Sequence, residues 1–212
     1  MARVSEANTI PTSPDRDAYH DNGLKLPADG QLDNGVPVFT ANARPPLVPP
    51  LNFSLVEDRI YRSGFPNPLN YPFLKQLGLK TIIYLGDLGQ EYNAWIGTTN
   101  IQFHHLVMES SQEPFTSLQE QQQARDSLRT ALQLMLDKNN FPMLIHSNKG
   151  KHRIGVLVGL MRKIFQGWCM SGIFEEYEKF ALGKSEFDLE FMELWQPELW
   201  VSQDSRPEFL RS

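Results

Sequence analysis

The sequence of 212 residues has one cysteine, Cys169, and no apolar run that approaches the roughly 20 residues of a membrane-spanning helix. A single thiol excludes a disulfide framework and a cysteine-rich zinc site, and it is typical of a reducing compartment. The opening residues, MARVSEANTIPTSPDRD, contain no apolar segment of the kind found in signal peptides. These absences predict a cytoplasmic protein without a membrane segment or a metal site.

Positive charge is also scarce, because 20 Lys and Arg residues face 25 Asp and Glu residues, which gives a formal net charge of −5. A general nucleic-acid-binding protein is usually basic, so this balance argues against such a partner. Hydrophobic residues make up 41% of the chain, which is enough to bury the core of a globular domain.

The distribution of proline divides the chain. Eight of the 15 prolines lie in residues 1–50, among many Asn, Asp, Gly and Ser residues. Such a segment buries too little apolar surface to offset the entropy lost on ordering. We therefore predict a flexible tail over residues 1–46, a folded domain over residues 47–200 and a C-terminal tail over residues 201–212.

Within the domain, segments with the periodicity of strands alternate with segments of helical periodicity. A hairpin and three buried strands are predicted, over residues 51–63, 79–85, 101–106 and 141–145. Five helices are predicted, over residues 69–77, 117–137, 155–165, 171–180 and 187–194. This alternation predicts an α/β layer fold.

The segment Met143–Gly159, MLIHSNKGKHRIGVLVG, leads from a buried strand through a polar loop into an apolar helix. Such a turn can aim several backbone N–H groups at one anion, and the N-terminus of the helix adds partial positive charge. Gly150 permits a backbone angle that a larger residue would resist. Arg153 has the planar fork that suits two oxygens of a phosphate.

The charge around this loop is one-sided, because six Lys and Arg residues and no acidic residue lie between Asp137 and Glu175. A solvated basic helix edge would have the same composition, but the glycine and arginine at the strand–helix turn favour an anion site. A Walker A loop is a poor match, because Gly150 and Lys151 are followed by His152 and no glycine lies five residues before Gly150.

Residues 146–153, HSNKGKHR, match the pattern H-C-x-x-G-x-x-R of cysteine-dependent phosphatases at every fixed position except the nucleophile. More narrowly, residues 50–195 resemble the plant- and fungi-type atypical dual-specificity phosphatases. Other motifs of that family occur in the same order, namely IYRSG at 60–64, LGLKTIIYL at 77–85, the run ending in EPF at 109–115, and GWC with IFEEYEKF within 167–180.

The resemblance implies the fold of cysteine-dependent phosphatases, with a central, mostly parallel sheet flanked by helices. It also implies a phosphorylated ligand, which is an inositol pyrophosphate or polyphosphate or a phosphoprotein, and no cofactor. Related phosphatase-family subunits are implied as partners, because several fungal paralogues form one complex. The implied catalytic residues are Ser147, which takes the nucleophile position, and Arg153. The implied phosphate-binding residues are Ser147, Asn148, Lys149, Gly150, Lys151, His152 and Arg153.

Two departures from the family pattern bear on catalysis. The family's cysteine attacks phosphorus as a thiolate, whereas the hydroxyl of Ser147 is scarcely ionised at neutral pH and needs a base beside it. His146 is adjacent in sequence, but the passage from strand to loop is expected to point the two side chains apart. The family's hydroxyl residue after the arginine, which bonds the nucleophile, is replaced by Ile154.

The resemblance leaves the general acid open among Asp87, Glu109 and Glu113, because phosphatases of this class use a carboxylic acid on a separate loop. Cys169 is not a displaced nucleophile, and we expect it to be a core residue.

Three functions are compatible with these residues. The first is a phosphate-binding pseudophosphatase with lost or weak catalysis. The second is an active tyrosine, dual-specificity or inositol pyrophosphate phosphatase whose loop cysteine has been replaced at position 147. The third is a structural subunit of a phosphatase-family complex. Lys149, Lys151, His152 and Arg153 would repel one another without an anion, and this favours retained anion binding over the third function.

Overall fold

The computed structural model describes residues 47–86, 93–108, 118–183 and 185–211. Residues 1–46, for which a flexible tail is predicted, lie outside the described residues. No helix within the described ranges is long and apolar enough to cross a membrane.

A five-stranded sheet with the strand order β1-β2-β5-β3-β4 forms the centre of the domain. β1 (Ser54–Glu57) and β2 (Ile60–Ser63) form an antiparallel hairpin at one edge. The other neighbours are parallel, and they comprise β5 (Met143–His146), β3 (Thr81–Gly86) and β4 (Gln102–Val107). The predicted α/β fold with a mostly parallel central sheet is therefore confirmed.

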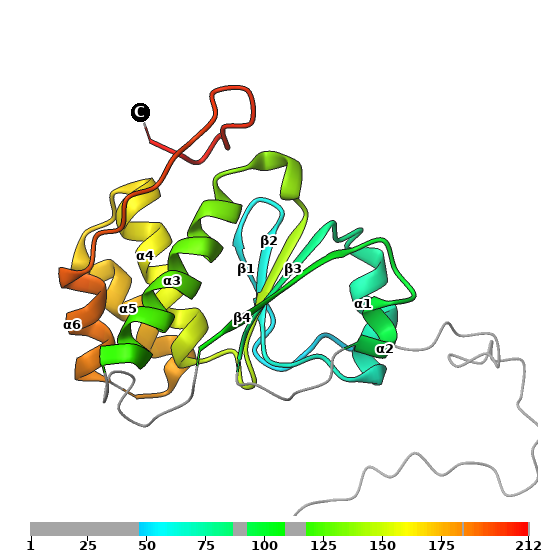
Figure 1. Ribbon diagram of the computed structural model, residues 1–212. Coiled ribbons are helices and arrows are strands. Elements are labelled where there is room, and N and C mark those ends of the chain that lie inside the picture. The colour runs from blue at the N-terminus through cyan, green and yellow to red at the C-terminus, as the bar shows by residue number, and fades with distance from the viewer. Residues whose placement is uncertain (1–46, 87–92, 109–117, 184, 212) are drawn as a thin grey trace, which may run out of the picture. The chain divides into compact units, whose positions relative to one another are not determined.

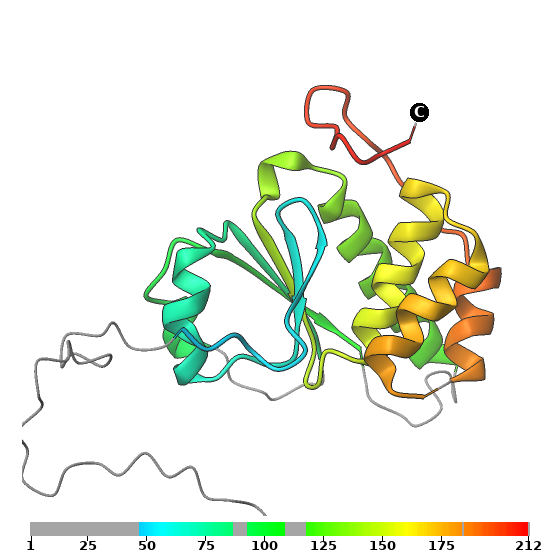
Figure 2. The same ribbon diagram turned by 180° about the vertical axis from the view of Figure 1, so that it is seen from behind.

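Helices cover both faces of the sheet (Figures 1 and 2). One face carries two short helices, α1 (Tyr71–Gln76) and α2 (Asn93–Ile96). The other face carries four helices, α3 (Leu118–Met135), α4 (His152–Gln166), α5 (Met170–Ala181) and α6 (Glu186–Leu194). Short 3-10 turns precede α1 at Pro68–Asn70 and β5 at Lys138–Asn140.

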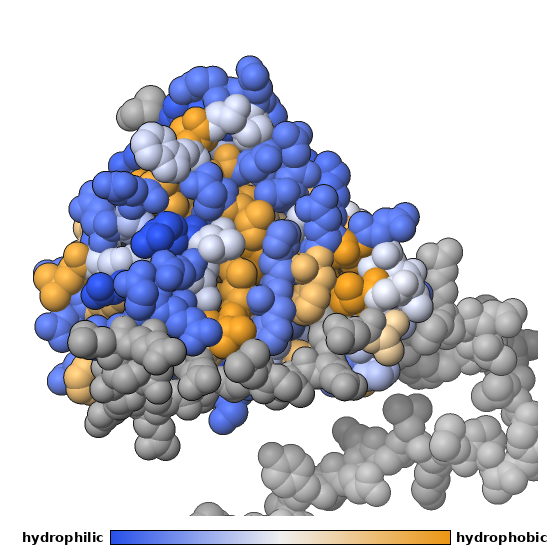
Figure 3. Space-filling model, viewed as in Figure 1, coloured by the Kyte–Doolittle hydropathy of each residue, from blue (hydrophilic) through white to orange (hydrophobic). Residues whose placement is uncertain are grey.

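This arrangement explains the apolar pattern of the chain. All six residues of β3 are buried, because a central parallel strand is covered on both sides. α4 is apolar around most of its circumference, since it packs between the sheet and the helices α5 and α6. α3 buries Leu128, Leu132 and Met135, and its side of the molecule shows mostly hydrophilic residues to solvent (Figure 3). The predicted strands and helices are all present, but the strand predicted as buried over residues 101–106 is β4, an edge strand that is only partly buried. α2 has only four residues and too little periodicity to be predicted.

Residues 201–211, which the sequence analysis separates as a C-terminal tail, pack on the domain. The N–H of Arg211 donates to the carbonyl of Phe165 in α4 over 2.9 Å. The ring of Phe209 stacks on that of Phe165 with 6.3 Å between centroids. Val201, Phe209 and Leu210 contribute to the main core. The packed domain therefore reaches residue 211.

The expectation that Cys169 is a core residue is wrong. The chain leaves α4 at Gly167 in a left-handed conformation, with φ of 63°, and Cys169 lies in the short connection before α5. The side chain is exposed, and its Sγ lies 3.3 Å from Oγ of Ser171. A residue in such a connection follows neither helix face, so helical periodicity does not determine its burial.

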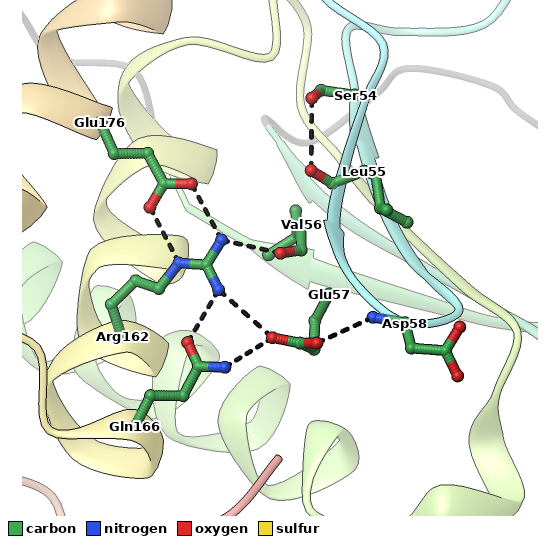
Figure 4. Close-up of polar contacts among 8 residues, drawn as sticks. All are labelled: Ser54, Leu55, Val56, Glu57, Asp58, Arg162, Gln166 and Glu176. Atoms are coloured by element: carbon green, nitrogen blue, oxygen red, sulfur yellow. Dashed lines mark hydrogen bonds and ion pairs between the residues drawn. The ribbon is translucent and has the colours of Figure 1, made fainter. Parts of the chain in front are cut away.

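A buried arginine joins the β1–β2 hairpin to α4 and α5 (Figure 4). The side chain of Arg162 is 7% exposed, and it donates two hydrogen bonds to the carboxylate of Glu176, of 2.9 and 3.0 Å. It also donates to the carbonyl of Val56 and to the side chain of Gln166, each over 2.7 Å, and lies 3.6 Å from the carboxylate of Glu57. A single charged group thus fixes a strand edge against two helices.

Replacing Arg162 by Met is expected to lower the free energy of unfolding by about 3–5 kcal/mol, because it leaves two largely buried carboxylates uncompensated. Arg129 provides the matched control, since its ion pair with Asp126 spans 3.1 Å with both side chains about half exposed. Arg129→Met should cost less than about 1 kcal/mol. Urea unfolding of both variants measures the difference, and equal costs would contradict the structural role of Arg162.

Candidate anion-binding site

The loop after β5 lies where the central strand of the sheet ends and α4 begins. β5 is buried at all four positions, and α4 starts at His152, so residues 147–151 form the turn between them. The first N–H groups of a helix have no partner inside the helix, and they carry partial positive charge. The predicted strand–loop–helix unit is therefore present, with the open end of the helix facing the loop.

Gly150 lets the loop press against the turn that follows β2. Its φ is 68°, and a Cβ at this position would lie 2.5 Å from the backbone N of Gly64 and from the backbone carbon of Ser63. The N–H of Phe65 donates to the carbonyl of Asn148 over 3.1 Å, on the same side of the loop. Any side chain at position 150 would both clash and be strained, so only glycine permits this contact.

Arg62 of β2 lies beneath the loop and is 1% exposed. Its Nη2 donates to the carbonyl of Gly150 over 3.0 Å and to that of Lys151 over 3.5 Å. Its guanidinium carbon lies 3.7 Å from the centre of the Phe180 ring. The carbonyl of Lys151 also accepts a shorter hydrogen bond, of 2.7 Å, from the N–H of Gly155 in α4. Because C=O and N–H point in opposite directions across a trans peptide, the carbonyl of Gly150 turned toward Arg62 directs the N–H of Lys151 away from it. Arg62 and the first turn of α4 therefore orient the donors of the loop together.

Arg62 remains charged in this position. Burial lowers the pKa of Arg62 to about 10, and the negative charge of Glu176 opposes that shift. The guanidinium consequently keeps its proton at neutral pH.

Ser147 is buried at the floor of the loop, and its Oγ accepts a hydrogen bond of 3.1 Å from the N–H of Gly150. Its own N–H donates to the carbonyl of Ser63 over 3.4 Å. Among the described residues, no carboxylate or imidazole is hydrogen-bonded to this hydroxyl. The Ser147 hydroxyl thus has a backbone donor that would stabilise negative charge, and none of the described residues is placed as a base to remove its proton.

His146 does not supply that base. It is fully buried, and its ring packs between Tyr84 and Phe65, with centroid distances of 4.9 and 5.5 Å. Burial lowers the pKa of His146 to about 3, so the ring is neutral and a very weak base at neutral pH. This agrees with the expectation that His146 and Ser147 do not act together.

Four basic side chains, together with Asn148, lie on the loop and the first turn of α4. Lys149 and His152 are exposed, whereas Lys151 and Arg153 are partly exposed. Nη1 of Arg153 lies 3.4 Å from the carbonyl of Leu85, at the end of β3. The amide oxygen of Asn148 accepts a hydrogen bond of 2.6 Å from the hydroxyl of Tyr84, so this side chain supports the loop from below.

The remaining site predictions concern catalysis. The three candidates for the general acid, Asp87, Glu109 and Glu113, lie outside the described residues. Ile154 is fully buried in the core, where it offers no hydroxyl to the loop. Within the described part of the chain, no group of three or more His, Cys, Asp or Glu side chains is placed to hold a metal ion.

The comparison with known families agrees with this geometry. The model of the tyrosine phosphatase family, Y_phosphatase2, matches residues 47–211. The chain belongs to this family. Its relatives place it with the atypical dual-specificity phosphatases that resemble inositol pyrophosphate phosphatases, as the loop motif predicts.

Two curated relatives and one solved structure are especially similar. The tyrosine-protein phosphatase-like protein OCA2 of Saccharomyces cerevisiae is 44% identical over 172 residues, which cover 77% of this chain and 83% of OCA2. The inositol diphosphatase DSP4 of Arabidopsis thaliana is 46% identical over 152 residues, which cover 70% of this chain and 74% of DSP4. The catalytic core of Siw14, a PP-IP phosphatase of S. cerevisiae, superposes with a TM-score of 0.64 at 37% identity, over 72% of this chain and 89% of that core.

The sequence analysis missed the role of Arg62. The residue lies in the motif IYRSG, and only its position in a strand was predicted. An arginine between apolar residues of a buried strand is itself a signal, because a charged side chain is rarely buried without a partner. The sequence could not name that partner, because Gly150 and Lys151 lie almost 90 residues away.

Replacing Arg62 by Met should lower the free energy of unfolding by about 1–3 kcal/mol, because the carbonyl of Gly150 loses its donor. It should also abolish the rise in melting temperature that millimolar sulfate is expected to cause, because the loop N–H groups lose their common direction. Calorimetric melting with and without sulfate measures both effects.

Arg59→Met is the control for this experiment. Arg59 lies just before β2, and its Nη2 donates to the carbonyl of Phe141 over 2.9 Å, at the opposite end of the sheet from the loop. This variant should be destabilised and yet keep the response to sulfate. A sulfate response of Arg62→Met equal to that of the parent would show that the loop does not depend on Arg62.

Proposed function

We propose that this chain binds a phosphorylated ligand in the loop of residues 147–153, and that catalysis is lost or weak because Ser147 occupies the nucleophile position. The ligand class is an inositol pyrophosphate or polyphosphate, or a phosphoprotein. The names of the relatives, inositol diphosphatase and PP-IP phosphatase, support the inositol class, and the tyrosine phosphatase family supports the phosphoprotein class.

The proposal rests on one contrast: the loop backbone is shaped to bind an oxyanion, whereas the side chain at the nucleophile position is the hydroxyl of Ser147. Arg62, the left-handed Gly150 and the start of α4 give the loop a shape suited to an oxyanion. Burying a charged arginine beneath the loop and ordering a glycine in a left-handed conformation both cost free energy. Binding an anion would offset that cost. A loop that served only as structure would not need its N–H groups directed outward.

The chemistry of Ser147 supports lost or weak catalysis. A thiolate attacks phosphorus without further activation, whereas a serine hydroxyl must lose its proton to a base. His146, with a pKa of about 3, cannot take that proton at neutral pH. A loss of four decades in rate corresponds to about 5.5 kcal/mol of activation free energy, and we expect the missing thiolate to cost at least that much.

Arg153 is proposed to hold two oxygens of the bound phosphate. Arg153→Ala should abolish the rise in melting temperature caused by inorganic phosphate or sulfate, and Arg153→Lys should weaken it, because lysine cannot bind two oxygens at once. Ligand at about 100 times its dissociation constant adds about 2.7 kcal/mol to the free energy of unfolding, which is easily measured. Arg129→Ala, on the exposed face of α3, is the control and should respond like the parent.

Titration with an inositol pyrophosphate, an inositol polyphosphate and a phosphotyrosine peptide would then identify the ligand class. Binding that survives Arg153→Ala would show that the loop is not the site. Absence of binding by all of these anions, sulfate included, would favour the structural subunit over the phosphate-binding protein.

A second prediction concerns the reaction. The chain should not hydrolyse phosphotyrosine mimics or inositol pyrophosphates at a measurable rate, and Ser147→Cys should raise the rate by at least about 100-fold, because a thiolate then meets the preformed N–H groups. Adding Ile154→Thr should accelerate the Cys variant but not the Ser parent, because the hydroxyl acts only on a thiolate. Phosphate release measures these rates.

The exposed thiol of Cys169 requires a control, so the same series should be made with Cys169→Ser. Equal rates in both series would assign the activity to position 147. Robust hydrolysis by the unaltered chain, free of contaminating phosphatase, would overturn the proposal and favour an active enzyme.

A further inference from the structure

Three side chains from three helices meet beside the loop. Nδ1 of His152, at the start of α4, lies 2.7 Å from the hydroxyl oxygen of Tyr177 in α5. That hydroxyl donates a short hydrogen bond to Oδ2 of Asp188 in α6. Nδ1 of His152 also lies 3.4 Å from the same carboxylate oxygen. His152 is therefore connected to a buried carboxylate through a tyrosine.

The positions of the protons follow from these contacts. The Tyr177 hydroxyl has one proton, and it donates this proton to Asp188. Toward His152 the Tyr177 oxygen can then only accept, so Nδ1 of His152 must carry a proton. Nε2, on the other edge of the ring, is left as the nitrogen that gains or loses a proton.

The arrangement is built into the packing of the helices. Asp188 is 6% exposed and Tyr177 is 1% exposed, whereas the side chain of His152 is 53% exposed. Gly155, one turn after His152, leaves room for the tyrosine, because a Cβ there would lie 2.7 Å from the Tyr177 ring. The buried pair is thus fixed, and only the histidine reaches solvent.

The ionisable groups that contact His152 from the neighbouring helices are Tyr177 of α5 and Asp188 of α6, and Lys151 and Arg153 flank it along the chain. Burial raises the pKa of Tyr177 far above its usual range, and the hydrogen bond to Asp188 adds to this effect. Tyr177 therefore keeps its proton at every pH at which the protein would be studied.

Burial keeps His146 neutral above about pH 3, so His146 adds no charge to the loop.

We infer that Tyr177 and Asp188 are positioning residues of the anion site, which hold the Nδ1 proton of His152 so that Nε2 takes up a proton when an anion enters the loop. The inference rests on the proposed function of the loop. A protonated Nε2 adds one positive charge between Lys151 and Arg153, where it favours a bound anion. Anion binding is therefore coupled to the uptake of a proton at Nε2, and this coupling makes binding weaker as the pH rises.

The tautomer can be measured without any ligand. In the full chain with ¹⁵N-labelled histidine, long-range ¹H–¹⁵N spectra at pH 8 should show neutral His152 with its proton on Nδ1. A neutral histidine side chain in water prefers the proton on Nε2, so Tyr177→Phe should shift His152 toward that form. His152→Gln identifies the signal. A neutral His152 with its proton on Nε2 in the parent would overturn the inference, whatever the loop binds.

Sulfate is the probe for the proton uptake, because it remains a dianion over the whole range, whereas inorganic phosphate itself titrates near neutral pH. Calorimetry in two buffers that differ in ionisation enthalpy gives the protons taken up for each sulfate bound. The parent should take up a fraction of a proton near pH 7, and its affinity should fall by about three- to tenfold between pH 6 and pH 8. His152→Gln should show neither effect.

Tyr177→Phe and Gly155→Ala test the positioning role, because each leaves His152 in place but removes or displaces the tyrosine hydroxyl. Both should lower the proton uptake while sulfate still binds, and melting curves would show that each variant folds. Gly159→Ala, one turn farther along α4, is the control for disturbed packing, because a Cβ there would lie 2.2 Å from Sδ of the buried Met192 and 3.1 Å from the side chain of Ile173. Sulfate binding without proton uptake would overturn this inference alone, whereas no binding to the parent would overturn the proposed function.

Discussion

The loop of this protein depends on one buried arginine. Arg62 reaches from β2 to the carbonyl of Gly150 over 3.0 Å, and this contact directs the N–H of the same peptide, that of Lys151, toward the open side of the loop. A carbonyl that pointed out of the loop would repel an anion, and the N–H of the same peptide would then point into the protein interior. The proposed anion site thus depends on a charge placed under the loop, on a strand far away in sequence.

The same electrostatic network also holds the fold together. Glu176 of α5 binds Arg162 through two hydrogen bonds, and its charge opposes the lowering of the Arg62 pKa by burial. The carboxylate of Glu176 therefore hydrogen-bonds Arg162 and also stabilises the charge of Arg62. Arg162 in turn fixes the β1–β2 hairpin, on which Arg62 lies, against α4 and α5 (Figure 4). Loop shape and hairpin position are consequently coupled through charges that solvent does not screen.

A loop of this kind can bind an anion even when the residue at the nucleophile position is changed. Binding an oxyanion needs directed N–H groups, a helix N-terminus and cations, and none of these depends on the side chain at position 147. Transferring a phosphoryl group needs a nucleophile as well, and the Ser147 hydroxyl has only a backbone donor near it among the described residues. The residues that orient the loop and those that would perform the reaction are separate sets, so one set can change while the other persists.

The sequence by itself determined the order of strands and helices, the strand–loop–helix unit around Gly150 and Arg153, and the membership of the phosphatase family. The first two features are local, because they follow from periodicity, glycine and charge within a few neighbouring residues. The family membership follows instead from the resemblance of several motifs, in the same order, to those of a known family. Only the tertiary structure decided that Cys169 is exposed, that residues 201–211 pack on the domain, and which groups meet Arg62 and His152. Those outcomes depend on contacts between residues distant in the chain, which periodicity does not encode.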